Sequence, residues 1–313
     1  MIPQGFKPNL AINSDDVTVQ PKVRYVSEKK DGVRVVFFGG VAYSRSLKPL
    51  PNKIIQKIAQ DNAEILQGAD GEIIAGDSYA KDVLQRSVSF AMKEDKVDEF
   101  TIFLFDRFDQ ANPNQVWFIR YYKLVAMKNK LPPNVEVLSH YLVEEGYPYT
   151  PSNMETLGKV DLDLFEQYVL AKGGEGCITR DGEGLYKFGR SGKVKPSIQK
   201  LKRFQDDEFK VVGYEQLESN QNEAKTNELG RTARSTSKEG KVPVEALGAL
   251  VLALPDGRTF NAGSGFTEKQ RKDLWQEKDT LQGRLAKIKF FGYSPDGVPL
   301  LPTFLDFRSE LDL

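Results

Sequence analysis

The chain has 313 residues, 40% of them hydrophobic and 28% charged, so it can bury one large core or two moderate ones, and we expect two domains. Lys plus Arg and Asp plus Glu both number 44, so net charge gives no sign of a polyanionic partner. One cysteine and one histidine exclude an internal disulfide, a cysteine-rich zinc site and mechanisms that need two histidines. No apolar run is long enough to span a bilayer and the start lacks a signal peptide, so we expect a cytoplasmic protein without membrane partners.

The first part of the chain mixes predicted strands and helices. Residues 21–38 contain two β-rich runs around Asp31-Gly32, which predicts a hairpin with Lys29 near a strand end. Residues 52–66 keep helical spacing, and residues 160–172 predict a second helix that ends at Gly173-Gly174. Residues 69–77 and 98–109 each place carboxylates beside an apolar run, as expected of strands that deliver side chains to a cleft.

The character of the sequence changes after Arg203. Short β-rich runs at residues 208–216, 248–266 and 286–297 are separated by Gly, Pro and Asp turns, which predicts a small all-β barrel. Residues 218–241 are polar and poor in large apolar side chains, which predicts a mobile loop. We therefore expect an α+β domain over residues 1–203 and an all-β domain over residues 204–313.

Residues 184–203 form a basic segment without a single acidic residue. Alone, this pattern is typical of a solvated basic face. Its cations are Lys187, Arg190, Lys193, Lys195, Lys200, Lys202 and Arg203.

The residues that suggest chemistry begin at Lys29. Residues 29–34 read K-K-D-G-V-R and match the pattern K-x-D-G-x-R, although a charged hairpin with an Asp-Gly turn is the competing interpretation of this segment alone. Further short motifs follow in order: Asp70-Gly71-Glu72, Phe105-Asp106, Glu175-Gly176-Cys177-Ile178 and Lys200-Leu201-Lys202. Each is weak singly, but the series resembles the covalent nucleotidyltransferase superfamily, which comprises ATP-dependent DNA ligases, RNA ligases and mRNA capping enzymes.

The C-terminal part extends the resemblance to small two-domain DNA ligases of phage type. Residues 262–271, AGSGFTEKQR, resemble the G-x-G-F segment of the ligase OB domain, and residues 302–310, PTFLDFRSE, resemble the P-x-F-x-x-x-R motif of phage ligases. Many members place a further basic residue after this motif, whereas here the chain ends in SELDL, so only Arg308 is carried over. The resemblance implies an antiparallel-sheet nucleotidyltransferase domain with helices, followed by an OB-fold barrel.

The resemblance also implies an activity in three steps. Lys29 takes AMP from ATP, the AMP passes to the 5′-phosphate at a nick in double-stranded DNA, and the 3′-hydroxyl displaces the AMP. It implies ATP with Mg²⁺ or Mn²⁺ as cofactors, nicked duplex DNA as partner, a monomer, and a part in DNA replication, repair and recombination. If a phage encodes the chain, the cytoplasm is that of its host cell.

The residue types suit this chemistry. Lysine with a pKa of about 10.4 is protonated at neutral pH, so we expect neighbouring cations and a bound metal ion to lower the pKa of Lys29. The expected neighbours are Arg34, Lys200 and Lys202, and the two lysines also offer positive charge to the phosphate oxygens. Glu175 is the first candidate for a Mg²⁺ ligand, because this hard cation prefers oxygen.

The resemblance assigns the remaining roles. Glu72 binds the ribose hydroxyls and is a second candidate metal ligand, and Phe105 stacks on adenine, although a core strand residue is the competing interpretation of Phe105. Arg45 contacts the 5′-phosphate or the adenylate, and Arg308 orients the outer phosphates of ATP and then moves away as the second domain grips DNA. The expected nucleotide-binding residues are Lys29, Arg34, Arg45, Glu72, Phe105, Glu175, Lys200 and Lys202, and the expected catalytic residues are Lys29, Arg34, Lys200, Lys202 and Arg308.

Three alternatives are weighed against the DNA ligase. An RNA ligase or a capping guanylyltransferase shares the first motifs, but the C-terminal motifs favour DNA. An NAD-dependent ligase would need a cysteine zinc site that one cysteine cannot supply. A non-catalytic OB-fold nucleic-acid binder has no reason to keep Lys29, Glu175 and the Lys200/Lys202 pair.

Overall fold

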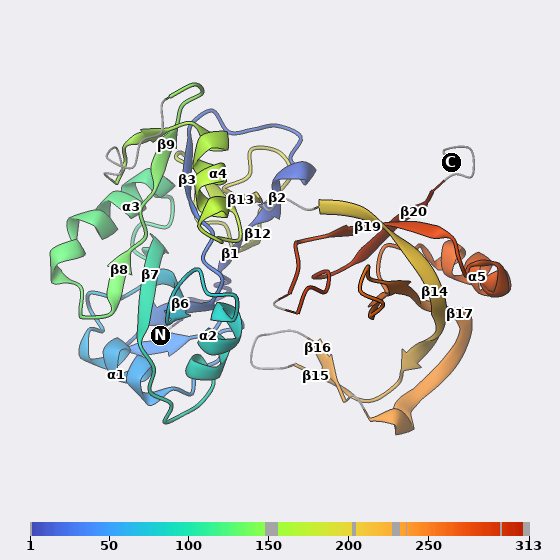
Figure 1. Ribbon diagram of the computed structural model, residues 1–313. Helices are drawn as coiled ribbons and strands as arrows, with labels where there is room; N and C mark the ends of the chain where they lie inside the picture. The colour runs from blue at the N-terminus through green and yellow to red at the C-terminus, as the bar shows by residue number, and fades with distance from the viewer. Residues whose placement is uncertain are drawn as a thin grey trace. The chain divides into compact units, whose positions relative to one another are not determined.

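The computed structural model describes residues 2–147, 156–201, 205–226, 232–235, 237–294 and 296–308. Lys202 and the last residues after Arg308 therefore lie outside the described residues. The chain divides into two compact units, an N-terminal unit of Met1–Lys202 and a C-terminal unit of Arg203–Thr226 and Thr232–Leu313, and each is described by itself (Figure 1). None of the helices in the described part is long and apolar enough to cross a membrane.

The first sheet of the N-terminal unit has the strand order β5-β4-β6-β7-β8. Its neighbouring strands are antiparallel except for the parallel pair β7 and β8. One face carries Val35 and Ile73 and packs under α1 and α2, whereas Arg34 and Glu72 lie on the other face, because side chains alternate along a strand. The elements are β4 (Val33–Phe38), β5 (Val41–Tyr43), α1 (Lys53–Asp61), β6 (Ala69–Ala75), α2 (Val83–Ala91), β7 (Phe100–Arg107) and β8 (Val135–Val137).

Helix α1 confirms the start of the helix predicted over residues 52–66 but ends at Asp61, and Asn52 explains where it begins. The side-chain oxygen of Asn52 accepts hydrogen bonds from the amides of Ile54 and Ile55 at 3.0 and 3.2 Å. Its side-chain amide donates to three carbonyls in the segment from the end of α2 to Lys96, at 2.9–3.0 Å. One fully buried asparagine therefore caps α1 and ties it to α2.

The second sheet of the N-terminal unit has the strand order β10-β9-β3-β11-β13-β2. Its helix α4 packs on the face that carries Val26 and Cys177, and ends at the predicted glycine pair, where Gly173 has a φ of 87°. The elements are β2 (Ile12–Asn13), β3 (Arg24–Glu28), β9 (Tyr141–Val143), β10 (Lys159–Val160), α4 (Leu162–Ala171), β11 (Cys177–Asp181) and β13 (Ile198–Leu201).

The predicted Asp31-Gly32 hairpin is wrong. Strand β3 pairs with β9 and β11, whereas β4 pairs with β5 and β6, so Asp31-Gly32 carries the chain from one sheet to the other. A Cβ atom at Gly32 would lie 2.1 Å from the carbonyl oxygen of Ile73, so glycine is needed here for close packing on β6.

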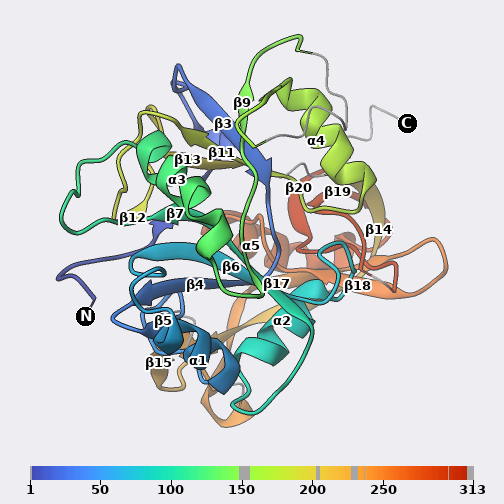
Figure 2. The same ribbon diagram turned by 90° about the vertical axis from the view of Figure 1, so that its left-hand side faces the viewer.

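The remaining elements of the N-terminal unit complete the two-sheet arrangement that Figure 2 shows from a second side. Helix α3 (Trp117–Ala126) packs on β7, and its Trp117 and Tyr121 are buried against Tyr25 of β3. Short strands β1 (Asn9–Leu10) and β12 (Gly189–Arg190) pair in parallel. Two short 3₁₀ turns lie at Ser14–Asp16 and Lys128–Lys130.

The C-terminal unit is built on a five-stranded sheet with the order β18-β17-β14-β19-β20. We predicted a barrel, but the described hydrogen-bonded order is open, and its two edges meet at a bridge between Ser264, which follows β18, and Thr303 of β20. Three register shifts between β14 and β17 bend the long β14, which lets the sheet curl around one apolar core. The strands are β14 (Gln205–Asn220), β17 (Lys241–Ala253), β18 (Thr259–Ala262), β19 (Leu285–Phe290) and β20 (Thr303–Phe307).

Two features complete the C-terminal unit. Helix α5 (Glu268–Gln276) packs on β17 and begins with a capping box between Thr267 and Gln270. The segment predicted as a loop over residues 218–241 contains the end of β14 and the paired strands β15 (Ala224–Thr226) and β16 (Thr232–Arg234), while residues 227–231 lie outside the described part. Two 3₁₀ turns lie at Lys238–Gly240 and Lys278–Thr280.

Candidate active site

Lys29 lies directly after β3, opposite the turn that leads into β11. Its amide donates to the carbonyl oxygen of Gly176 at 2.9 Å, which continues the pairing of Glu28 with Cys177. Its ammonium group forms an ion pair with the carboxylate of Glu175, and both side chains are mostly buried. The first and fourth sequence motifs therefore meet at one point, although residues of these motifs are 146 positions apart.

Lys200 lies on the same face of this sheet as Lys29. In the register, Lys200 of β13 is opposite Ile178 of β11, and Ile178 is opposite Ser27 of β3. Side chains two positions apart share a face, so Ser27 and Lys29 point to the side that carries Lys200. The opposite face is the apolar core beneath α4.

Arg34 and Glu72 face each other across β4 and β6 of the first sheet. The Arg34 guanidinium donates to both oxygens of Asp70, at 2.5 and 2.7 Å, and to the carbonyl oxygen of Asn9 at 3.2 Å. Burial raises the pKa of the Glu72 carboxyl to about 7, although the charges of Arg34 and Lys29 oppose this rise. Asp70 of the D-G-E motif thus holds Arg34 in place, a role that the sequence did not reveal.

The environment of Lys29 differs from the expected one. Burial lowers the pKa of the Lys29 ammonium, but the carboxylates of Glu175, Glu72 and Asp31 outweigh burial, so the pKa is raised. We predicted that neighbouring cations would lower it. These acidic side chains belong to three of the motifs, and their negative charge favours the ammonium form of Lys29.

Phe105 is a buried residue of β7 whose ring contacts two arginines. The guanidinium carbons of Arg34 and Arg180 are 4.7 and 4.9 Å from the centre of its ring, and only 8% of Phe105 is exposed. The two guanidinium groups come from different sheets, so Phe105 marks where the two sheets approach each other. This position places the ring next to Arg34, at the edge of the candidate site.

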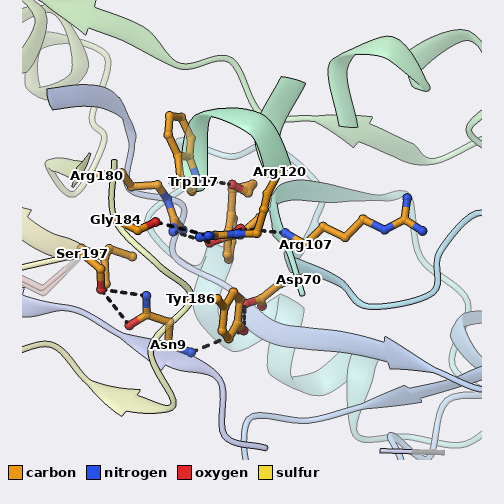
Figure 3. A network of polar contacts seen from close by, with 12 residues as sticks. Asn9, Asp70, Arg107, Trp117, Arg120, Arg180, Gly184, Tyr186 and Ser197 are labelled. Atoms are coloured by element: carbon orange, nitrogen blue, oxygen red, sulfur yellow. Dashed lines mark hydrogen bonds and ion pairs between the residues drawn. The ribbon is translucent and has the colours of Figure 1, made fainter. Parts of the chain in front are cut away.

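A buried polar network surrounds Asp106, the residue after Phe105, and Figure 3 shows Arg120, Arg180, Tyr186 and Asp70 within it. Asp106 accepts hydrogen bonds from Arg120 at 2.8 and 3.2 Å and from Arg180 at 3.1 Å. Burial would raise the pKa of Asp106, but these two guanidinium groups hold it below its ordinary value. The hydroxyl of Tyr186 donates to Asp70 at 2.5 Å and connects this network to Arg34. Arg120 and Arg180 are therefore positioning residues that sequence motifs alone did not single out.

A second set of contacts braces the residues on either side of Lys29. The carboxylate of Glu28 accepts hydrogen bonds from Tyr79 and from Lys30, both at 2.6 Å. The Lys30 ammonium also lies 4.7 Å from the ring centre of Phe103 on β7. Tyr79 follows β6, so this group ties β3 to the other sheet next to the nucleophile candidate.

Two further expected residues, Arg45 and Arg308, follow strands. Arg45 is exposed on the tight turn after β5, where the amide of Ser44 donates to the carbonyl oxygen of Lys48 at 2.8 Å. Arg308 follows β20 in the C-terminal unit, and its guanidinium donates to Glu208 at 3.0 Å. Arg308 belongs to the other unit, so it is not part of the site described here.

The described residues contain no cluster of three carboxylate, histidine or cysteine side chains that could hold a metal ion by themselves. Two carboxylates, Glu72 and Glu175, nevertheless both act on the charge of Lys29. Mg²⁺ commonly uses one or two protein carboxylates and completes its shell with water and substrate phosphates. The oxygen donors therefore fit a Mg²⁺ ion that arrives with a nucleotide.

The second sheet thus brings together Lys29, its partner carboxylate Glu175 and, on the same sheet face, a second lysine, Lys200. Residues 239–308 match the family model of the DNA ligase OB-like domain. No curated protein matches the chain.

Solved structures of DNA ligases match the whole chain. One is a Lig E DNA ligase described as binding DNA with a minimal scaffold, at 22% identity and a TM-score of 0.67, which covers 98% of this chain and 100% of that one. Another is the Chlorella virus DNA ligase-adenylate, at 25% identity and a TM-score of 0.50, with 97% and 99% covered. A protein named Pmar-Lig_Pre matches at 23% identity and a TM-score of 0.68, with 97% and 68% covered. The chain therefore has the fold of the DNA ligases, which confirms the resemblance predicted from its motifs, and its C-terminal part is a DNA ligase OB-like domain.

Proposed function

We propose that the chain is an ATP-dependent DNA ligase that seals nicks in duplex DNA through a lysine–AMP intermediate. The observation that carries the proposal is the ion pair of Lys29 with Glu175, on a sheet face that also carries Lys200 and in a chain with the DNA ligase fold. Nucleic-acid binding alone would not require residues of five motif segments, far apart in sequence, to lie near one another.

The first step forms a P–N bond. The Lys29 Nζ passes a proton to the Glu175 carboxylate and attacks the α-phosphorus of ATP, and the bond between the α-phosphorus and the bridging oxygen breaks to release pyrophosphate. Glu175 is the acceptor that the Lys29 Nζ contacts, so it orients the amine before attack. Lys200 offers positive charge on the same face, where the leaving pyrophosphate gains negative charge, and Lys202 of the same motif would add to it.

Glu72 and Arg34 act on the other side of the site. A Glu72 carboxylate can accept hydrogen bonds from the ribose hydroxyls. Arg34, held in place by Asp70, provides a fixed positive charge beside Glu72. Glu175 with Glu72 would hold the Mg²⁺ or Mn²⁺ ion, which when bound neutralises charge on the phosphate oxygens. Arg45 would contact the 5′-phosphate or the adenylate through its planar fork, and Phe105 would border the adenine.

The later steps require DNA. AMP passes from Lys29 to the 5′-phosphate of the nick, the 3′-hydroxyl attacks that phosphate, and AMP leaves. The basic segment over residues 184–203, and the residues 220–241 with their five Lys and Arg residues, would contact the phosphate backbone. If deletion of residues 225–240 leaves the salt dependence of DNA binding unchanged, these residues do not contribute phosphate contacts.

The proposal extends to the domain boundary, the oligomeric state and the cellular role of the chain. We place the boundary between the nucleotidyltransferase and OB domains near residue 203, and expect a monomer in the cytoplasm, of the host cell if the chain is phage-encoded. The process served would be DNA replication, repair or recombination, since each leaves nicks. Arg308 would orient the outer phosphates of ATP in the first step only.

The test uses α-³²P-labelled ATP or GTP with Mg²⁺, the full chain and its Lys29→Ala variant, read on a denaturing gel and followed by a chase with nicked DNA. We expect label from ATP on the full chain, none on Lys29→Ala, and loss of label to DNA as the nick closes. Label from GTP would indicate capping chemistry, and sealing of RNA alone an RNA ligase. No label would overturn the enzymatic assignment in favour of a nucleic-acid binder.

A further inference from the structure

A pocket at the end of β7 lies outside the candidate active site. Its volume is about 130 Å³, and it is lined by Arg107, Asp109, Gln115, Arg120 and Lys123. Arg107 is four residues after Phe103, which pairs with Glu72, so its Cα is roughly 13 Å along the strand from the row that carries Glu72. Figure 3 shows the Arg107 side chain extending away from the buried network, while its amide donates to Asp106. The pocket is therefore distinct from the site of Lys29.

The Arg107 guanidinium has no strong acceptor. Within the described part of the chain its side-chain hydrogen bond goes to the sulfur of Met127, at 3.1 Å, and a thioether is a weak acceptor. Burial lowers the pKa of Arg107, and the charge of Asp109 only partly offsets this. A half-buried arginine is normally paired with an anion, because an uncompensated buried charge is costly. Most of the donors of Arg107 thus remain available to a ligand.

The one carboxylate in the pocket is already committed to its own loop. Asp109 accepts hydrogen bonds from the amide of Ala111 at 3.0 Å and from the side-chain amides of Asn112 and Gln115 at 3.2 and 3.3 Å. These contacts, with a longer one from Lys123 at 3.4 Å, hold its pKa below the ordinary value despite burial. Asp109 therefore does not neutralise Arg107 at hydrogen-bond distance.

The other cations are held in fixed positions. Arg120 is anchored by Asp106 and by the carbonyl oxygens of Gln115 and Gly184, at 2.5 and 3.2 Å. Lys123 lies one turn further along α3 on the same side of the helix, and its ammonium reaches the side-chain oxygen of Gln115 at 2.9 Å. The end of β7 and helix α3 thus present three cationic side chains to a hollow that has room for several water molecules.

We propose that this pocket binds a phosphate oxyanion, with Arg107 as the planar donor and Lys123 as the second cation. Arginine matches the geometry of phosphate oxygens through two parallel hydrogen bonds, and lysine adds a point charge. The oxyanion is either free phosphate or a phosphate of the DNA backbone, and the two sources are separated by experiment. The proposal does not rest on the ligase activity.

The first experiment titrates the full chain with inorganic phosphate in chloride buffer of low ionic strength, followed by calorimetry. We expect saturable binding that weakens about tenfold or more in Arg107→Gln, since charge-assisted hydrogen bonds are lost. Arg107→Lys should fall between, because it keeps the charge and loses the fork. Lys128→Gln removes an exposed cation outside the pocket lining and should bind within twofold of the unchanged chain.

The second experiment measures binding to an intact duplex as a function of salt. If the oxyanion belongs to DNA, Arg107→Gln lowers the slope of log K against log salt by about 0.9, the value for one phosphate contact. If it is free phosphate, the slope stays unchanged while the calorimetric loss remains. Arg107→Gln that alters neither measurement overturns the proposal. Self-adenylation by Arg107→Gln should be unchanged. The phosphate-site proposal and the proposed ligase function can therefore be refuted independently of each other.

Discussion

His140 makes the pH dependence of stability a quantitative test of the structure. It is the only histidine of the chain and is fully buried, with Trp117 and Tyr121 ring centres 4.9 and 4.6 Å away. Its Nδ1 lies 3.0 Å from the carbonyl oxygen of Leu138 and Nε2 has no hydrogen-bond partner in the described residues. Burial and the charge of Arg180 lower the pKa of His140 from 6.5 to about 3. The folded chain therefore holds this imidazole neutral.

The sign and size of the effect follow from linkage. The unfolded chain binds a proton at His140 below pH 6.5 and the folded chain does not until about pH 3, so stability is lost as pH falls through this window. One pKa unit corresponds to about 1.36 kcal/mol, so between pH 7.5 and pH 5 the contribution of His140 to the free energy of unfolding falls by about 2 kcal/mol. This value hardly depends on the folded pKa as long as it stays below 4.

The assay is urea unfolding at pH 7.5 and pH 5 for the full chain and for His140→Phe, which keeps an aromatic ring in the same packing. We expect the full chain to lose about 2 kcal/mol more than the variant between the two pH values. Glu72, whose raised pKa works in the opposite direction, is present in both proteins and cancels in the comparison. Equal losses in the two proteins would refute a neutral buried His140.

The remaining predictions concern positioning residues. Asp106→Asn leaves two buried guanidinium groups without their carboxylate, so we expect the free energy of unfolding to fall by about 3–5 kcal/mol in urea denaturation, and an unchanged midpoint would contradict the network. Tyr79→Phe removes the hydrogen bond to Glu28 and should slow self-adenylation severalfold at unchanged ATP affinity, whereas weaker ATP binding alone would place Tyr79 at the nucleotide. Arg308→Ala should slow self-adenylation at least tenfold while the exposed Arg258→Ala does not, and a wild-type rate in Arg308→Ala would remove Arg308 from the first step.

The sequence predicted those parts of the site that motifs carry. Lys29, Glu175 and Lys200 were singled out from short motifs, and the register of three neighbouring strands brings them to one sheet end. The helix over residues 160–172 was also predicted, because its periodicity and its glycine pair are local signals. Local sequence patterns and the order of the motifs were therefore sufficient to predict most of the fold class.

The features that the sequence did not predict depend on contacts between residues that are far apart along the chain. The Asp31-Gly32 segment has the pattern of a hairpin, but strand pairing with β6 and β11 decided its conformation. The raised pKa of Lys29 follows from carboxylates whose distance only the fold sets. Arg120 and Arg180 likewise gave no signal, because an arginine in a helix or strand is ordinarily exposed.

The K-x-D-G-x-R segment combines a local sequence motif with contacts to residues far away along the chain. Lys29 follows β3 of one sheet and Arg34 lies in β4 of the other. The segment from Lys29 to Arg34 therefore connects the two sheets directly. Gly32 permits this because its α-carbon packs where a Cβ would meet the Ile73 carbonyl at 2.1 Å. Glu28 and Lys30, held together by Tyr79 and Phe103, fix the backbone on either side of Lys29. The spacing of the segment thus reflects a structural requirement, since Lys29 lies where the chain passes between two sheets and its neighbours are anchored to both.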